Sequence, residues 1–337
     1  MLTERLSVSQ NTFLEKIKSI DFFLILIIVL IGSISIFAIY STEGGTFSYY
    51  TKNHLIRLLT FFFMFLALSF IRITTWYRHA YLFYFLGLAL LFFVIFFGVT
   101  SSGSKRWINL YFLNLQPSEL MKIAIIVCFA RFFHREQITN VSSFKNIIVS
   151  LAILVMPIVL VVSQPDLGTS ILIAASGLIV LWLAGLNIRY FVYSGLILLI
   201  SFPFVISFLK PYQKLRILSF FNPDRDPLGA GYQIIQSKIA VGSGGLTGKG
   251  FLQGTQSYLE FLPEKHTDFI FTLFSEEHGF IGSVFLLIIY GILIYRIIKI
   301  GSISRSYFGR LFCYGFGSAI FIYIAVNMSM VLGLLPI

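Results

Sequence analysis

Long apolar stretches separated by short polar ones dominate the pattern of the chain. A helix of about 20 apolar residues spans the roughly 30 Å hydrocarbon core of a bilayer. Windows of about that length lie at 22–40, 55–71, 80–99, 118–133, 145–163, 167–186, 190–209, 269–298 and 308–333. The pattern therefore predicts an all-α polytopic membrane protein with nine spans, in which residues 1–337 form a single transmembrane domain.

Composition agrees with this class, and the basic residues set an orientation. Only 12% of the residues are charged, 57% are hydrophobic and the mean hydropathy is +0.89, which is outside the range of soluble domains. With residues 1–21 as a cytoplasmic N-terminus, the short external loops hold only Lys52, Lys105 and Arg106. Thirteen Lys and Arg residues fall in the cytoplasmic segments, as the positive-inside rule requires: Arg5, Lys16, Lys18, Arg72, Arg78, Arg131, Arg135, Lys145, Arg189, Arg296, Lys299, Arg305 and Arg310. The net charge of +11 therefore needs no nucleic-acid partner to explain it.

Residues 210–267 contain no plausible span, so they are predicted to form a large extracytoplasmic loop between spans 7 and 8. Tyr232 to Val241 is expected to form a short amphipathic helix within this loop. The stretch GSGGLTGKG (242–250) is not a Walker A loop, because Ser243 stands where that motif needs glycine and Gly250 follows Lys249. Two interpretations stay open: a flexible turn, or backbone N–H groups and Lys249 approaching an anionic head group.

Three ionisable residues, Glu264, His266 and Asp268, stand where this loop returns to the bilayer. They are either interfacial polar residues, with Asp268 favoured near a helix N-terminus, or part of a reaction site. Their E-x-H-x-D spacing is not a standard zinc pattern. No metal site is predicted from it, and Cys128 and Cys313 are predicted to be packing residues.

Further ionisable residues lie within or between the apolar windows. Glu119 and Lys122 are three residues apart, so they share a helix face and could pair. Asp166 stands between two apolar windows. Charged groups at such depth are costly and usually face a cavity or each other, which leaves open a structural pair or a polar cavity.

Several long segments resemble the SEDS family (shape, elongation, division and sporulation) of peptidoglycan polymerases. They are GSKRWINL (103–110), LQPSELMKIA (115–124), QPDLGTS (164–170), FFNPDRDPLGAGYQIIQSKIAVGSGGLTGKG (220–250), GTQSYLEFLPEKHTDFIFTLFSEEHGFIG (254–282) and NMSMVLGLLPI (327–337). The resemblance extends from the first span to the last residue. The pairing of GKG with GTQSYLEFLPEKHTDF resembles the elongation-type RodA branch more than the division-type FtsW branch.

The resemblance implies a helical bundle in the bacterial inner membrane, with ten spans and a large loop between the seventh and eighth. In the family a further span with a serine- and glycine-rich motif follows the point where this sequence stops, so nine spans are expected here. The implied activity is a peptidoglycan glycosyltransferase that polymerises lipid II during cell-wall elongation and cell-shape maintenance.

The resemblance also assigns roles to residues. Asp268 matches the family's essential aspartate in HTDFIF and is expected to be the general base. Cations expected to bind the pyrophosphate or lipid head group are Lys249, Lys238, Lys265 and Arg106. The residues expected to shape the substrate cavity are Glu119, Lys122 and Asp166.

The implied partners are lipid II and its undecaprenyl lipid, a class B penicillin-binding transpeptidase and membrane proteins of the elongation complex. Mg²⁺ or Mn²⁺ is expected only as a cation bound with the substrate pyrophosphate, without a dedicated protein site. Two alternatives remain at this point: a lipid II flippase or transporter that uses the same cavity, and a scaffold of the wall-synthesis complex without chemistry of its own.

Overall fold

The structure, a computed structural model, describes residues 17–101, 104–109, 114–135, 141–208, 211–222, 230–255 and 265–335. Within these ranges the helices are α2 Phe22–Thr42, α3 Tyr49–Ser69, α4 Ile73–Phe97, α5 Pro117–Arg135, α6 Phe144–Ser163, α7 Leu167–Leu183, α8 Ile188–Phe208, α9 Pro211–Phe221, α10 Ala230–Ser243, α12 Ile270–Ile303 and α13 Tyr307–Val331. Short strands follow α4 at β1 Val99–Ser101, β2 Ser104–Asn109 and β3 Asn114–Leu115.

Every predicted apolar window coincides with one helix over most of its length, and the chain is a multi-pass membrane protein. In the described part of the chain, α2, α3, α4, α6, α12 and α13 are long and apolar enough to cross a membrane. Of the others, α7 has only 17 residues, and α5 carries Glu119 and Lys122 near its start. Nine spans, and the position of the large loop between the seventh and eighth, stay predictions.

The purely α-helical prediction is incomplete, because a small antiparallel sheet lies between α4 and α5. Its strand order is β1-β2-β3, with Val99 opposite Trp107 and Ile108 opposite Leu115. A search for 20-residue apolar windows does not detect strands of this length. The sheet matters because β2 carries Arg106, one of the predicted site residues.

Two helices begin earlier than the apolar windows indicate, at Tyr49 and at Ile73. Polar residues such as Lys52 and Asn53 continue the helix without contributing hydrophobicity, so hydropathy locates the membrane core better than the helix end. The short helix expected within Tyr232 to Val241 is confirmed as α10.

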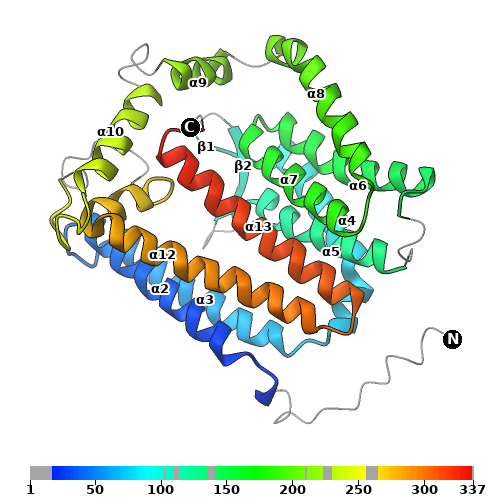
Figure 1. The fold of residues 1–337 in the computed structure, drawn as a ribbon, viewed down its shortest axis with the longest axis horizontal. Helices are drawn as coiled ribbons and strands as arrows, with labels where there is room; N and C mark the ends of the chain where they lie inside the picture. Colours follow the sequence, from blue (N-terminus) through cyan, green and yellow to red (C-terminus); the bar gives the residue numbers. More distant parts are fainter. Residues whose placement is uncertain are drawn as a thin grey trace.

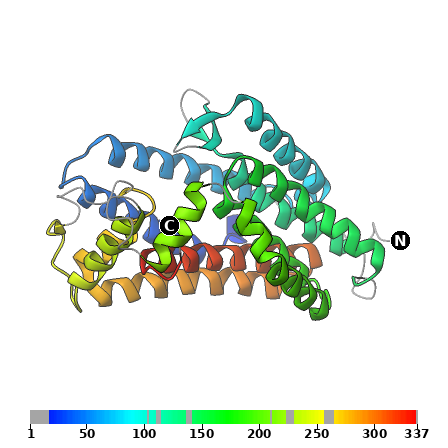
Figure 2. The ribbon, with the colours of Figure 1, turned by 90° about the horizontal axis from the view of Figure 1, so that it is seen from above.

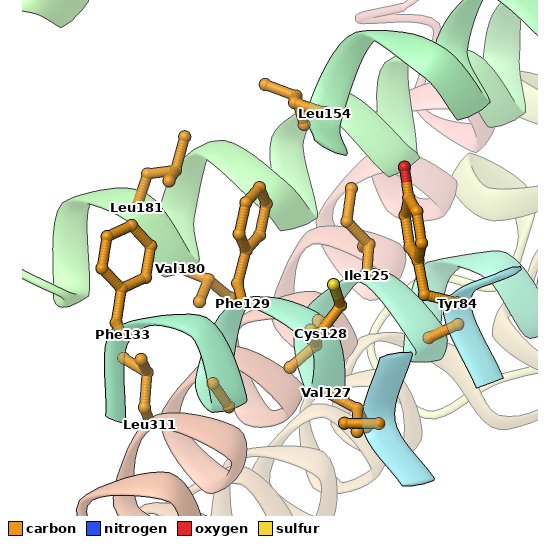
Figure 3. Packing of buried hydrophobic residues seen from close by; sticks show 14 of the residues in the cluster. Tyr84, Ile125, Val127, Cys128, Phe129, Phe133, Leu154, Val180, Leu181 and Leu311 are labelled. Atoms are coloured by element: carbon orange, nitrogen blue, oxygen red, sulfur yellow. The ribbon is translucent and has the colours of Figure 1, made fainter. Parts of the chain in front are cut away.

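The main core surrounds α5, which is apolar on several faces and packs against α4, α7 and α13. Ile125, Phe129 and Phe133 of this helix are fully buried or nearly so, and Figure 3 shows them among side chains of the neighbouring helices. A helix that is apolar around its circumference is expected at the centre of a bundle. At its periphery, Gly177 of α7 gives Leu154 the room to approach closely.

The helix α13 joins two parts of the bundle. It packs against α12 on one side and against α5 and α7 on the other, while α2 packs against α12 and α3. Figure 1 shows α2 running beside α12, and Figure 2 shows α3 and α12 on opposite sides of the molecule, with α8, α9 and α10 along the outer side of the bundle in Figure 1. The α13 helix is therefore placed to contribute side chains to any space between the two parts.

Asp21 links the beginning of α2 to the far part of α12. Its Oδ1 accepts a hydrogen bond of 3.0 Å from the Leu24 N–H, which caps α2, and its Oδ2 accepts one of 2.7 Å from Arg296 Nε. Burial by itself would raise the pKa of Asp21, but the Arg296 hydrogen bond and charge and the backbone N–H groups hold that pKa below its usual 3.8. The carboxylate is therefore the form that the fold stabilises.

We expect Asp21→Ala to lower the stability of the protein by about 1–2 kcal/mol through loss of the helix cap and ion pair. Thermal unfolding in detergent measures this effect. Because the folded pKa is lowered, the contribution is present above the unfolded value and is lost as pH falls through the folded value, so the two proteins should converge below about pH 4. Ser48→Ala is the matched control, because Ser48 caps α3 without a side-chain hydrogen bond; an equal loss there would contradict the assignment.

Candidate functional site

A cavity of about 480 Å³ lies between α5, α7, α12 and α13. Most of its lining is apolar, including Ile126, Phe316 and Ile320. Its polar lining residues are Glu119, Lys122, Ser176, Thr267, Tyr290, Tyr323 and Asn327. An apolar cavity with a few convergent polar groups has the composition of a ligand site.

Glu119 and Lys122 form the predicted pair within this cavity. The Lys122 ammonium donates to Glu119 Oε1 at 2.8 Å and is almost fully buried, whereas nearly half of the Glu119 side chain is exposed. The Tyr323 hydroxyl donates to the same carboxylate at 2.8 and 3.0 Å, and its ring lies 4.0 Å from the Lys122 ammonium. Together with Tyr323, the pair forms a three-residue cluster between α5 and α13.

Arg106 and Asp166 form a second pair next to the first. Arg106 Nη1 lies 3.3 Å from Asp166 Oδ2, and Asp166 Oδ1 accepts from the Thr169 N–H and so caps α7. The buried Asp166 carboxylate also interacts electrostatically with Lys122. Four predicted site residues therefore form one network of alternating charge, in which each buried charge has an opposite neighbour.

Asp268 lies next to residues that line the cavity, one position before Phe269, the N-cap of α12. Its neighbour Thr267 lines the cavity, and the amide of the lining residue Asn327 donates to the Asp268 carbonyl oxygen at 3.2 Å. Asp268 is solvent-exposed. The predicted base is therefore exposed to solvent, and its main chain contacts a residue that lines the cavity.

His266 anchors the segment that precedes Asp268. Its Nε2 lies 2.9 Å from Glu43 Oε1, its Nδ1 lies 3.1 Å from Thr42 Oγ1, and its ring stacks on Tyr50 with centroids 4.1 Å apart. These partners belong to the end of α2, the residue after it and the start of α3. Of the two motif neighbours of Asp268, His266 therefore acts as an anchor, and Glu264 lies outside the described residues.

The glycine-rich loop fills a break in α12. At Gly279 the backbone adopts φ 66° and ψ −163°, which only glycine adopts readily, so α12 consists of segments 270–278 and 280–303. The N–H groups of residues 280 and 281 donate to the carbonyls of Gly245 and Leu246, at 2.9 and 3.1 Å. The carbonyls of residues 276 and 277, which those N–H groups would bind in a continuous helix, accept from the N–H groups of residues 249 and 250, both at 3.0 Å.

This exchange gives the GSGGLTGKG stretch a definite structural role. A Cβ atom on Gly248 would lie 2.1 Å from the Glu277 carbonyl oxygen, and one on Gly279 would lie 2.3 Å from the Gly248 nitrogen. The loop and the broken helix therefore meet backbone to backbone. Figure 1 shows the end of α10, which leads into the loop, beside the start of α12.

The other predicted cations lie outside the charge network. Lys249 pairs with Glu276, with Nζ 2.5 Å from Oε1. Lys238 on α10 is exposed and its chain lies against Gly333, just after α13. Lys265 is half-buried in the segment leading to Asp268.

The structure adds residues that the sequence reasoning missed. Tyr323 and Asn327 are four apart in an otherwise apolar window, so they share a helix face, and that spacing was a usable signal. Glu276 and Glu277 are adjacent and buried, and two glutamates at the start of an apolar window were a second signal. Glu43 gave no comparable signal, because it lies in a polar turn between helices.

The family model of FtsW, RodA and SpoVE, described as cell cycle protein, matches residues 16–337. The chain belongs to this family. Among its relatives, the peptidoglycan glycosyltransferase MrdB of Escherichia coli K12 is 48% identical over 242 residues, which cover 72% of this chain and 65% of MrdB. The stage V sporulation protein E of Bacillus subtilis is 39% identical over 241 residues, 71% of this chain and 65% of that protein. The matches to these family members thus span slightly less than two thirds of their length.

A relative named probable peptidoglycan glycosyltransferase FtsW, from Trichlorobacter lovleyi, is 34% identical over 332 residues, covering 95% of this chain and 86% of the relative. Solved structures share the family fold. A chain from a study entitled "Structural coordination of polymerization and crosslinking by a peptidoglycan synthase complex" aligns with a TM-score of 0.80 and 27% identity, over 95% of this chain and 89% of that chain. The rod shape determining protein RodA of Thermus thermophilus aligns with a TM-score of 0.68 and 21% identity, over 92% and 85%.

We expect Gly248→Ala to destabilise the protein by about 3 kcal/mol or more, because the new methyl group meets a main-chain carbonyl that cannot move without opening the helix break. Gly245→Ala is the matched variant. Gly245 also has a positive φ, of 55°, but a Cβ atom there meets nothing within 4 Å, so only the conformational cost of about 1–2 kcal/mol applies. Thermal unfolding of both variants checks this, and equal losses would show that the backbone contact is not the cause.

Proposed function

We propose that this chain is a peptidoglycan glycosyltransferase that polymerises lipid II. The observation that carries the proposal is the position of Asp268, a solvent-exposed residue whose main chain contacts Asn327 of an apolar cavity that contains the Glu119–Lys122 pair. The membership of the family and the names of its MrdB and FtsW relatives support the same activity. Roles in cell-wall elongation and cell-shape maintenance are part of the proposal.

The proposed reaction joins two disaccharides through a new glycosidic bond. The 4-hydroxyl oxygen of one disaccharide attacks the anomeric carbon of the other, its proton passes to the Asp268 carboxylate, and undecaprenyl pyrophosphate leaves with the electron pair of the broken bond. A lipid-anchored sugar stands at head-group level, which is where a solvent-exposed residue next to the cavity can meet it. The apolar lining supplies contact for part of the isoprenoid chain.

The departing pyrophosphate needs positive charge. Lys238, Lys265 and Arg106 are the proposed contributors, and Glu119, Lys122 and Asp166 shape the cavity and its field. Among the described residues, no group of three or more His, Cys, Asp or Glu side chains could hold a metal ion. The proposal has Mg²⁺ or Mn²⁺ bound with the pyrophosphate oxygens of the substrate, where it would neutralise the leaving charge.

The proposed setting is the bacterial inner membrane, with the N-terminus cytoplasmic and residues 210–267 outside, as the distribution of Lys and Arg favours. The proposed partner is a class B penicillin-binding transpeptidase within the elongation complex. One similar solved chain comes from a study of a peptidoglycan synthase complex that coordinates polymerization and crosslinking. This similarity supports such a pairing.

Transport of lipid II across the bilayer is a second candidate. The observation that favours it is the Glu119–Lys122–Tyr323 cluster inside the helical bundle, because polar groups there could line a path for a polar head group. A scaffold without chemistry is the third candidate, and it would need neither Asp268 nor the cavity.

The deciding experiment uses the protein purified with its transpeptidase and supplied with labelled lipid II, and it resolves the glycan products on a gel. We expect a ladder of products with the wild type and a loss of at least about 100-fold in rate with Asp268→Asn, because the amide cannot accept the proton. Glu15→Gln, in the predicted cytoplasmic N-terminus, is the control and should retain the ladder.

The other outcomes separate the candidates. A ladder of equal strength with Asp268→Asn would show that Asp268 is not the base. If the wild type makes no ladder but moves labelled lipid II across vesicle membranes, the transport function replaces the enzyme. If it does neither and still binds the transpeptidase, the scaffold remains.

A further inference from the structure

Glu276 is a carboxylate buried completely at the break in α12. Its Oε1 accepts from the Lys249 ammonium at 2.5 Å, from the Thr255 N–H at 3.0 Å and from the Thr255 hydroxyl at 2.7 Å. The same ammonium donates to the Thr255 hydroxyl at 2.9 Å. A buried carboxylate without such partners would be strongly unfavourable, so Lys249 is the counter-ion that this position requires.

The pair lies directly beside the backbone exchange that fills the helix break. The Lys249 N–H donates to the Glu276 carbonyl at 3.0 Å. The two residues are therefore joined once through their main chains and once through their side chains. Losing the ion pair would therefore weaken the attachment of the whole loop to α12.

The short segment of α12 between the break and Asp268 is fixed by further contacts at several points. The Ser41 hydroxyl on α2 donates to the buried Glu277 carboxylate. The Thr272 hydroxyl hydrogen-bonds with Ser237 of α10 at 2.9 Å, and Ser237 in turn donates to a carbonyl of α13. Segment 270–278 is thus held by contacts on several sides, with Asp268 two positions before it and the Lys249–Glu276 pair near its other end.

We infer that Lys249 is a positioning residue, which acts on Asp268 through Glu276 and the short segment of α12. This inference rests on the proposed polymerase activity and changes the role expected from the sequence, where Lys249 was a candidate ligand of the pyrophosphate. Glu276 follows Asp268 by eight positions in the chain, and the helical part from residue 270 to residue 276 rises about 9 Å along its axis. A displacement of this segment moves the base relative to the cavity without removing any substrate contact.

The two roles of Lys249 predict different kinetics. A positioning residue sets the geometry of the reacting groups, so its loss lowers kcat and leaves KM for lipid II nearly unchanged. We expect Lys249→Met and Glu276→Gln each to lower kcat by about 10- to 100-fold. Lys238→Met is the contrasting variant. If the exposed Lys238 binds substrate, its loss should raise KM without changing the melting temperature.

The effects of the Lys249 and Glu276 substitutions on the melting temperature should also not be additive. The double variant Lys249→Met/Glu276→Gln should melt no lower than the worse of the two single variants, because it leaves no buried charge without a partner. Thr255→Val is a milder variant that removes only a hydroxyl from the cluster. It should change melting and kcat in the same direction by a smaller amount, and it keeps the test possible if Lys249→Met does not fold.

Hydrogen exchange of the purified full chain tests the coupling without any activity. In Lys249→Met and Thr255→Val, peptides covering 245–250 and 276–281 should exchange faster than in the wild type, since the four backbone hydrogen bonds across the break open together. This readout stays decisive if the wild type makes no polymer, in which case the proposed function fails and the positioning of the segment is judged on exchange and melting alone.

Two results would overturn the inference. One is a Lys249→Met variant with unchanged exchange and melting, a raised KM and an unchanged kcat, which would make Lys249 a substrate ligand. The other is strict additivity of the Lys249→Met and Glu276→Gln effects on melting, which would show that the two side chains act independently.

Discussion

The break in α12 at Gly279, filled by the backbone of residues 245–250, is the interaction on which the arrangement of the glycine-rich loop and the start of α12 depends. A continuous helix would satisfy its own N–H and carbonyl groups, whereas this one gives up two such bonds and makes four to a distant loop. The exchange is possible only because Gly279 and Gly248 carry no side chains where the two backbones meet. Hydrogen bonds between main-chain groups thus anchor the loop far more firmly than its glycine content suggests.

The consequence of this arrangement is a short, fixed helical segment in front of the bundle. Segment 270–278 is tied to α2 through Ser41, to α10 through Ser237 and to the loop through Lys249. His266 ties the preceding residues to the corner between α2 and α3. A carboxylate at the start of such a segment has a defined position although its side chain is exposed, and a defined position is the first requirement of a base that must meet a hydroxyl group.

The cavity behind Asp268 combines two environments that are normally incompatible. Its apolar walls come from the packed helices around α5, its charges are those of Lys122 and Glu119, and the Arg106–Asp166 pair lies next to them. Each charge is next to an opposite one, which makes the burial tolerable. The network leaves fixed charges in a region of low polarity, where charges interact more strongly than they would in water.

The sequence by itself determined the positions of the membrane-crossing helices, because about 20 apolar residues have no stable alternative to a helix in lipid. It also predicted the pair of Glu119 with Lys122, since helical spacing is a local property. The long motifs were sufficient to assign the family. Only the tertiary structure decided that Tyr323 completes that pair, that Arg106 meets Asp166, and that Lys249 is bound to a buried glutamate. Those contacts join residues far apart in the chain, and the glycine loop's partners are main-chain atoms, which every residue carries and which therefore leave no signature in a sequence.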